Sequence, residues 1–253
     1  MGTSDREAEP VALRFMTAGY QTFVLRYTTY YKTFASDSNQ KGREEPVLPQ
    51  ALFDLAKAVS TVREHADEWD VNPNQIVICG FSAGGHLAAS LGVHWHESFL
   101  SEELSVESEQ LRPNALILGY AVLDYILMKE EAEKEEAQWK HEVWKSSNHA
   151  VFGKEMPSLE ELNNISPVNF VTEATPPTFL WHTADDDLVY AQNSLHFATA
   201  LAKKRIPYEL HVFESGVHGL SLSDETTEND PVHVNQDCQV WVDLALKWLK
   251  KRM

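Results

Sequence analysis

Hydrophobic and polar residues along this chain follow two alternating periods. Short runs rich in aromatic and β-branched residues, typical of strands, recur between segments whose apolar residues lie three or four positions apart, as in amphipathic helices. Strands that alternate with helices predict a mostly parallel sheet with helices on both faces, the α/β class. The expected strands are residues 20–27, 75–79, 115–120, 178–182 and 208–213.

The intervening segments carry helix signals. Ser4 and Glu7 have the spacing of a capping box, which predicts a helix that ends near residue 18. Apolar residues at helical spacing predict further helices over 52–69 and 195–204. A helix rich in small residues is expected directly after residue 84. The expected C-terminal helix carries four apolar residues on one face: Trp241, Leu244, Ala245 and Trp248.

Two polar stretches interrupt this pattern. Residues 28–45 are expected to form a surface loop, and residues 124–168 are charged and less periodic. Within the second stretch, the Lys/Glu-rich run 129–140 predicts a solvated helix. We find no internal repeat, so we expect one domain over 1–253, with 124–168 as a cap or insertion.

Composition narrows the classes of function. The formal net charge of −17 argues against a nucleic-acid or anionic-lipid partner, because both require a surplus of Lys and Arg. No apolar run approaches the roughly 18 residues of a membrane span, and the first seven residues contain no signal-peptide core. The expected location is cytoplasmic, although a signal peptide is an open alternative if the native N-terminus lies upstream.

The two cysteines do not form a disulfide framework. Cys79 ends an apolar run that starts at Ile76, which predicts a buried, reduced thiol. Cys238 is far away in the sequence.

The segment Gly80-Phe81-Ser82-Ala83-Gly84 matches G-x-S-x-G in the setting that gives this motif meaning. An apolar strand precedes it and a helix follows it, so a sharp turn would hold Ser82 exposed and strained. The helix N-terminus would also favour negative charge on an attacked oxygen. Ser82 is therefore the predicted nucleophile. The alternative is a Gly/Ser turn that only connects a strand to a helix.

A serine hydroxyl needs a base, and the base needs a carboxylate to orient it. His218 follows the late strand 208–213 and has Gly216 and Gly219 nearby, so it is the predicted base. Three adjacent aspartates follow the strand 178–182, and one of them is the predicted acid: Asp185, Asp186 or Asp187.

The other histidines carry weaker signals. His94 and His96 could suggest a metal site, but residues two apart on a helix do not face each other and no third ligand is evident. We therefore expect no metal site. His86, His141 and His149 are interpreted as helix or surface residues.

With these motifs the chain resembles the bacterial acetyl-esterase or acetylxylan-esterase-like carboxylesterases of the α/β-hydrolase superfamily. The likeness extends from 6–12 and 23–27, through 62–66 and 80–87, to 176–186 and 218–220. It implies an α/β-hydrolase fold and hydrolysis of short-chain acyl esters, including acetyl groups on sugars, without a cofactor. In the family the acid lies three residues before a valine. Val189 has that place here and favours Asp186, although Tyr190 replaces the usual proline.

The front of the chain departs from the family. Members carry about three strands before this point, and the third ends in a glycine-rich loop that donates one oxyanion N–H. No glycine run occurs here, and Met1-Gly2-Thr3 stands where that loop would finish. The absent strand would lie between 20–27 and 75–79, so either the sequence is shortened, the gap closes, or another segment fills it. The Ala83 N–H is the one oxyanion donor expected within this chain.

Three functional hypotheses follow. The first is a serine carboxylesterase that acts on small-molecule or carbohydrate esters through Ser82, Asp186 and His218. The second is a serine peptidase, because a triad alone does not distinguish esters from amides. The third is a scaffold that has lost its chemistry. Strand edges left exposed by a missing segment would also favour self-association into a homo-oligomer.

Overall fold

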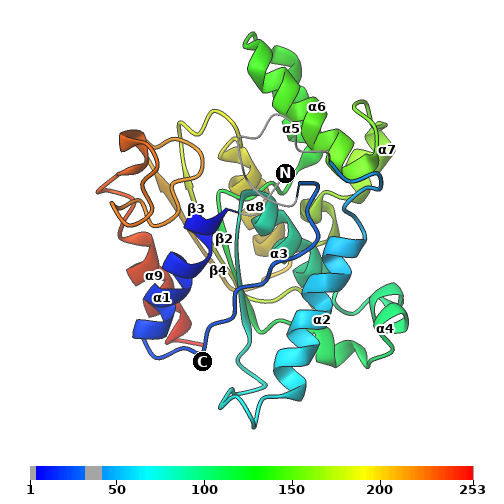
Figure 1. Cartoon of the computed structure of the whole chain (residues 1–253), viewed down its shortest axis with the longest axis vertical. Helices are drawn as coiled ribbons and strands as arrows, with labels where there is room; N and C mark the ends of the chain where they lie inside the picture. Colours follow the sequence, from blue (N-terminus) through cyan, green and yellow to red (C-terminus); the bar gives the residue numbers. More distant parts are fainter. Residues whose placement is uncertain (1–3, 32–41, 253) are drawn as a thin grey trace.

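The computed structural model describes residues 4–31 and 42–252. Four parallel strands form one sheet in the order β1-β2-β3-β4 (Figure 1). The sheet confirms the expected α/β class, and four of the five expected strands are present, β1 two residues later than expected. Their bounds are Val77–Phe81 for β1, Ala115–Gly119 for β2, Thr178–Thr183 for β3 and Tyr208–Phe213 for β4.

The strand register brings the carboxyl ends of all four strands to one edge of the sheet. Phe81 at the end of β1 pairs with Gly119 at the end of β2, and Thr183 of β3 pairs with Phe213 of β4. Loops that follow these strands therefore emerge side by side, which places their side chains close together in space.

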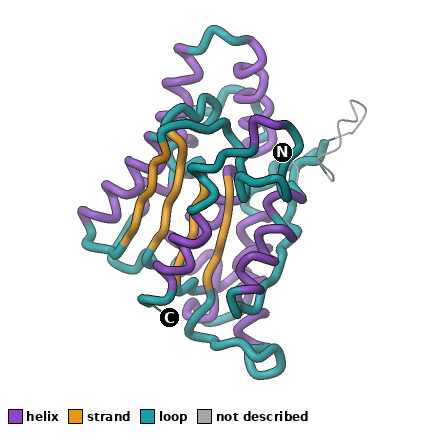
Figure 2. Tube along the Cα trace, turned by 90° about the vertical axis from the view of Figure 1, so that its left-hand side faces the viewer, coloured by secondary structure: helices purple, strands orange, loops and turns teal. Residues whose placement is uncertain are grey.

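Helices cover both faces of the sheet (Figure 2). Because successive residues of a strand point to opposite faces, Leu116 and Leu118 pack on one side and Ile117 on the other. The first side is covered by α2 (Gln50–Glu64), α3 (Ser82–His94) and α8 (Gln192–Lys203). The second is covered by α1 (Glu9–Thr17) and α9 (Trp241–Leu249). As predicted, Trp241, Ala245 and Trp248 of α9 are buried together.

The region 124–168 forms three helices beyond the carboxyl edge of the sheet, at the top of Figure 1. They are α5 (Tyr125–Lys134), α6 (Gln138–Phe152) and α7 (Leu159–Asn164). The single helix predicted over 129–140 is wrong, because the chain breaks between α5 and α6. At this break the Glu135 carboxylate accepts hydrogen bonds from the backbone N–H groups of Glu136 and Ala137.

Shorter elements complete the described chain. They are α4 (Ser98–Leu104) and the 3₁₀ helices η1 (Asp5–Glu7), η2 (Ser108–Leu111), η3 (Pro167–Phe170) and η4 (Pro231–His233). Within residues 4–31 and 42–252, none of the helices combines the length and apolar character needed to cross a membrane.

The capping box predicted at Ser4 and Glu7 is wrong. The Ser4 side chain makes no capping hydrogen bond, and the helix begins at Glu9 after the short turn of η1. The Glu7 carboxylate instead accepts a hydrogen bond from the Tyr120 hydroxyl at 2.7 Å. A tertiary contact has replaced the local one.

The strand predicted over 20–27 is also wrong. This segment has no regular secondary structure, and in the described part of the chain no strand pairs with it. A cavity of about 1200 Å³, lined by both 20–27 and β1, lies beside it. Among residues 4–31 and 42–252, neither closure nor a substitute strand removes this gap.

Two smaller expectations need correction. Cys79 lines the cavity and is exposed, so the buried thiol predicted there is wrong, whereas Cys238 is buried. The helix predicted over 52–69 ends at Glu64. The expected surface loop is irregular at 28–31 and 42–45; its remainder, 32–41, and Met1-Gly2-Thr3 lie outside the described residues.

Candidate active site

The turn between β1 and α3 holds Ser82 in a strained conformation. Strand β1 ends at Phe81, α3 begins at Ser82, and the φ angle of Ser82 is 49°. A non-glycine residue with such a φ lies in the left-handed region, which L-residues adopt at a cost. The turn is tight, because a Cβ added at Gly80 would lie 2.3 Å from the carbonyl oxygen of Gly84.

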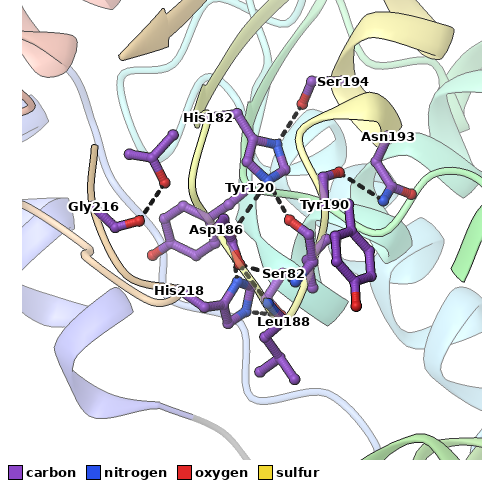
Figure 3. A network of polar contacts seen from close by, with 12 residues as sticks. Ser82, Tyr120, His182, Asp186, Leu188, Tyr190, Asn193, Ser194, Gly216 and His218 are labelled. Carbon is purple, nitrogen blue, oxygen red and sulfur yellow. Dashed lines mark hydrogen bonds and ion pairs between the residues drawn. The ribbon is translucent and has the colours of Figure 1, made fainter. Parts of the chain in front are cut away.

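His218 lies within hydrogen-bonding distance of Ser82. The two are 136 residues apart in sequence, yet His218 Nε2 is 2.9 Å from Ser82 Oγ (Figure 3). The loop after β4 reaches this position through Gly216 and Gly219, whose φ angles of 150° and 82° are positive.

The other ring nitrogen of His218, Nδ1, forms a hydrogen bond with the Asp186 carboxylate. The distance from His218 Nδ1 to Asp186 Oδ2 is 2.8 Å. An ionised carboxylate only accepts hydrogen bonds, so Nδ1 donates and Nε2 keeps its lone pair for the Ser82 hydroxyl. This tautomer is the one that a general base requires.

The Asp186 carboxylate is buried and heavily hydrogen-bonded. Its Oδ1 accepts from the backbone N–H groups of Leu188 and Val189 at 3.0 and 2.9 Å. Burial alone would raise the pKa of Asp186, but hydrogen bonds from His182 and His218 hold that pKa well below its usual range. The group is therefore a carboxylate at neutral pH.

The two neighbouring aspartates have other partners. Residues 184–191, between β3 and α8, form the acid loop. Asp185 Oδ1 accepts a hydrogen bond from the backbone N–H of Gly216 at 2.6 Å, which connects the acid loop to the loop that carries His218. Asp187 Oδ2 lies 2.9 Å from the Lys140 ammonium. Of the three candidates left open by the residues alone, Asp186 is the one placed against His218.

The sequence analysis did not identify Tyr120, whose ring packs against the imidazole of His218. Tyr120 follows β2, has a φ of 36°, and packs its ring edge-to-face with the imidazole of His218 at 5.1 Å between centroids. Its hydroxyl donates to Glu7 and accepts from the backbone N–H of Ser221, three residues after His218, at 2.9 Å. Burial raises the pKa of Glu7. The position of Tyr120 at the end of the strand predicted over 115–120 was the sequence feature that could have pointed to it.

The cavity connects this site with the region 124–168. Ser82, Ala83 and His218 line it, as do Tyr125, Met128 and Trp144 from α5 and α6. Ala83 stands in the first turn of α3, where backbone N–H groups lack partners within the helix. Its N–H can therefore serve an anion at this end of the cavity.

Lys140 links the helical region to the acid loop. Its ammonium lies 2.8 Å from Glu135 and 2.9 Å from Asp187, and its side chain is 14% exposed. Hydrogen bonds to these carboxylates raise the pKa of Lys140 to about 12.

No group of three or more His, Cys, Asp or Glu side chains with the arrangement of a metal site occurs among residues 4–31 and 42–252. His94 and His96 have separate surroundings: His94 packs on Phe170 at 4.7 Å between ring centroids, and His96 lies 3.7 Å from Glu97.

Sequence comparison matches the profile of the family described as BD-FAE to residues 11–201. Endo-1,4-beta-xylanase B of Butyrivibrio fibrisolvens is 32% identical over 87% of this chain and 30% of its own length. Acetylxylan esterase of Xylanibacter ruminicola is 29% identical over 67% of this chain and 31% of its own length. The chain thus spans about a third of the length of these curated relatives.

Solved structures match over nearly the whole chain. An acetyl ester-xyloside bifunctional hydrolase from Caldicellulosiruptor lactoaceticus is 32% identical, with a TM-score of 0.74, over 99% of this chain and 78% of its own. The carboxylesterase Cest-2923 from Lactobacillus plantarum is 28% identical, with a TM-score of 0.78, over 99% of this chain and 81% of its own.

Proposed function

This chain belongs to the BD-FAE family and has the α/β-hydrolase fold, and from that membership we propose that it is a serine carboxylesterase. The observation that carries the proposal is the continuous hydrogen-bonded line from Asp186 through His218 to Ser82, with links of 2.8 and 2.9 Å. Nucleophile, base and orienting acid stand in the order that such chemistry requires.

In the proposed reaction, Ser82 Oγ attacks the ester carbonyl carbon while His218 Nε2 takes the hydroxyl proton. The tetrahedral intermediate carries its negative charge at the N-terminus of α3, where the Ala83 N–H donates to it. His218 then gives its proton to the departing alcohol, leaving Ser82 acylated. Water activated by the same imidazole releases the acid and restores the serine. Asp186 holds the imidazole tautomer and stabilises the imidazolium.

Oxyanion stabilisation is the weak part of this machinery. Sites of this kind use two backbone donors, and the glycine-rich loop that supplies the second one in the family does not occur in these 253 residues. Removing one such donor lowers kcat by on the order of 10²–10³.

Short-chain acyl esters, including acetyl groups on carbohydrates, are the proposed substrates. Two of the relatives support this choice, one named an acetylxylan esterase and the other an acetyl ester-xyloside hydrolase. Tyr125, Met128 and Trp144 give the cavity an apolar wall beside Ser82, which suits the acyl side of an ester. The region 124–168 would act as the cap that limits substrate size.

Ser82→Ala tests the proposal. The variant should lose turnover of p-nitrophenyl acetate and labelling by a fluorophosphonate probe, while its circular dichroism and melting temperature stay close to those of the parent protein. Ser101→Ala in α4, far from the site, is the matched control and should retain both. Undiminished turnover in Ser82→Ala would refute the assignment. Well-folded parent protein that the probe fails to label would instead support a scaffold.

A further inference from the structure

His182 is a second imidazole on the catalytic carboxylate. It lies on β3 one residue before the end of the strand, and its side chain is 0% exposed. Its Nε2 is 2.6 Å from the carbonyl oxygen of Val189 and 3.3 Å from Asp186 Oδ2, and its Nδ1 is 2.8 Å from Ser194 Oγ (Figure 3). Both ring nitrogens are therefore engaged.

These partners define the tautomer of His182. The Val189 carbonyl and the Asp186 carboxylate can only accept, so Nε2 carries a hydrogen that is shared between them. Among the described residues, the one hydrogen-bond partner of the buried Ser194 hydroxyl is Nδ1. A buried hydroxyl must place its hydrogen on an acceptor, so Nδ1 is unprotonated and the ring is neutral.

Through these bonds, β3 holds the turn that carries Asp186. Asp186 Oδ1 caps the turn by accepting from Val189 N at 2.9 Å, while the carbonyl of the same Val189 is held by His182. Asp186 Oδ2 lies between two imidazoles, His182 at 3.3 Å and His218 at 2.8 Å. Rotation of the carboxylate away from His218 would also break the contact between Asp186 Oδ2 and His182 Nε2.

We propose that His182, anchored by Ser194, is a positioning residue that keeps the Asp186 carboxylate directed at His218. This inference rests on the proposed function of the same site. His182 touches neither Ser82 nor the cavity, so its contribution acts through Asp186 and should appear in kcat and not in KM. A misplacement of about 1 Å in such a constellation can lower a rate on the order of 10²-fold.

Three variants separate positioning from packing. His182→Leu keeps the bulk and removes all three polar contacts of the imidazole, so kcat on p-nitrophenyl acetate should fall about 10²-fold with KM within about twofold of the parent value. His182→Gln can place an amide N–H near the position of Nε2 and should restore kcat to within about fivefold of the parent. Ser194→Ala removes the anchor and should give an intermediate loss of roughly fivefold.

The matched control is His211→Leu on the neighbouring strand β4. His211 bonds Glu209 at 3.0 Å and has no contact with Ser82, Asp186 or His218. The kcat of the His211→Leu variant should equal that of the parent protein. A folded His182→Leu variant with unchanged kcat would overturn the proposal, as would a His182→Gln variant no more active than His182→Leu.

A measurement that needs no turnover keeps this inference separate from the proposed function. In ¹⁵N-histidine-labelled parent protein, NMR should show His182 protonated at Nε2 alone. The downfield proton of His218 Nδ1, bonded to Asp186, should shift or broaden in His182→Leu and stay in place in His211→Leu. A proton on His182 Nδ1, or an unaltered His218 signal in His182→Leu, contradicts positioning. Equal hydrolysis by parent protein and Ser82→Ala refutes the esterase proposal alone.

Discussion

The Tyr120 hydroxyl donates a hydrogen bond to the Glu7 carboxylate across 113 residues of sequence, at 2.7 Å. The same hydroxyl accepts from the backbone N–H of Ser221, and the Ser221 hydroxyl donates to the carbonyl oxygen of Arg6 at 2.6 Å. One phenol thus joins the N-terminal segment, the end of β2 and the loop of His218. These hydrogen bonds anchor the loop that carries His218, and none of them involves the His218 imidazole itself.

Tyr120→Phe removes this junction and leaves the half-buried Glu7 carboxylate and the buried Ser221 N–H without their partner. We expect the free energy of unfolding to fall by about 1–3 kcal/mol, the usual cost of an unsatisfied buried polar group. Urea denaturation of Tyr120→Phe, Glu7→Leu and the double variant measures the effect. The two losses should be less than additive, since both remove the same bond. Strict additivity would show that the pair is not coupled.

Gly85 and Gly84 form a natural pair for testing the turn of Ser82. A Cβ at Gly85 would lie 2.5 Å from the Cβ of Ala121, whereas a Cβ at Gly84 would meet nothing closer than the Tyr27 hydroxyl at 3.6 Å. Gly85→Ala should therefore push α3 away from the end of β2 and destabilise the fold by about 1–3 kcal/mol. In thermal melts each kcal/mol corresponds to roughly 2–4 °C for a chain of this size. Gly84→Ala should melt no lower than the parent; an equal drop in both variants would contradict the packing difference.

His86 predicts acid sensitivity of the fold. Burial lowers its pKa to about 4 from 6.5, partly offset by the hydrogen bond from Nε2 to the Ile165 carbonyl at 2.8 Å. Between pH 6.5 and about 4 the unfolded chain binds a proton at this site and the folded chain does not. Stability therefore rises with pH across this window and is lost as the pH falls through it.

His86→Gln offers the matched comparison, because its amide can also donate to Ile165 but does not titrate. Relative to that variant, the parent protein should lose about 2 kcal/mol of unfolding free energy between pH 7.5 and pH 5. Urea unfolding at both pH values measures this difference, and carboxylate effects cancel because both proteins share them. Parallel pH profiles would mean that His86 titrates normally.

Lys140 should affect substrate binding more than chemistry. It joins Glu135 of the α5–α6 turn to Asp187 of the acid loop, next to Asp186 but with no contact to it. Lys140→Ala should raise KM roughly two- to fivefold, since partly exposed ion pairs contribute about 0.2–1 kcal/mol. Lys145→Ala, which breaks a bond to Glu142 on the same helix, is the control. A fall in kcat with unchanged KM would place Lys140 in the catalytic machinery instead.

Local patterns were enough to predict the residues of the candidate site because these residues lie at strand ends. Ser82 is marked by glycines that a tight turn requires, Asp186 follows the buried strand β3, and His218 follows the strand β4, which is rich in aromatic and β-branched residues. The strand pattern does not reveal which of three aspartates faces the base. That choice depends on Lys140 and Gly216, which reach Asp187 and Asp185 from distant parts of the chain.

The expectations that failed concern partners that a local pattern cannot contain. Residues 20–27 have strand composition, but a strand exists only beside another strand, and here a cavity takes that place. Ser4 and Glu7 have capping spacing, but Glu7 is used by Tyr120. Tyr120 itself was counted as one more aromatic residue of a strand, because nothing in its neighbours indicates that its hydroxyl joins two distant loops.

The pairing of Thr183 with Phe213 fixes the register of β3 and β4, and with it the relative position of the loops that carry Asp186 and His218. Asp186 and His218 follow the adjacent strands β3 and β4, so a slip of one residue between these strands would shift one residue relative to the other by about 3.3 Å and turn the side chains of the slipped strand to the opposite face. Esterase turnover should therefore report on the register of β3 and β4 more sensitively than circular dichroism, which measures only the content of secondary structure.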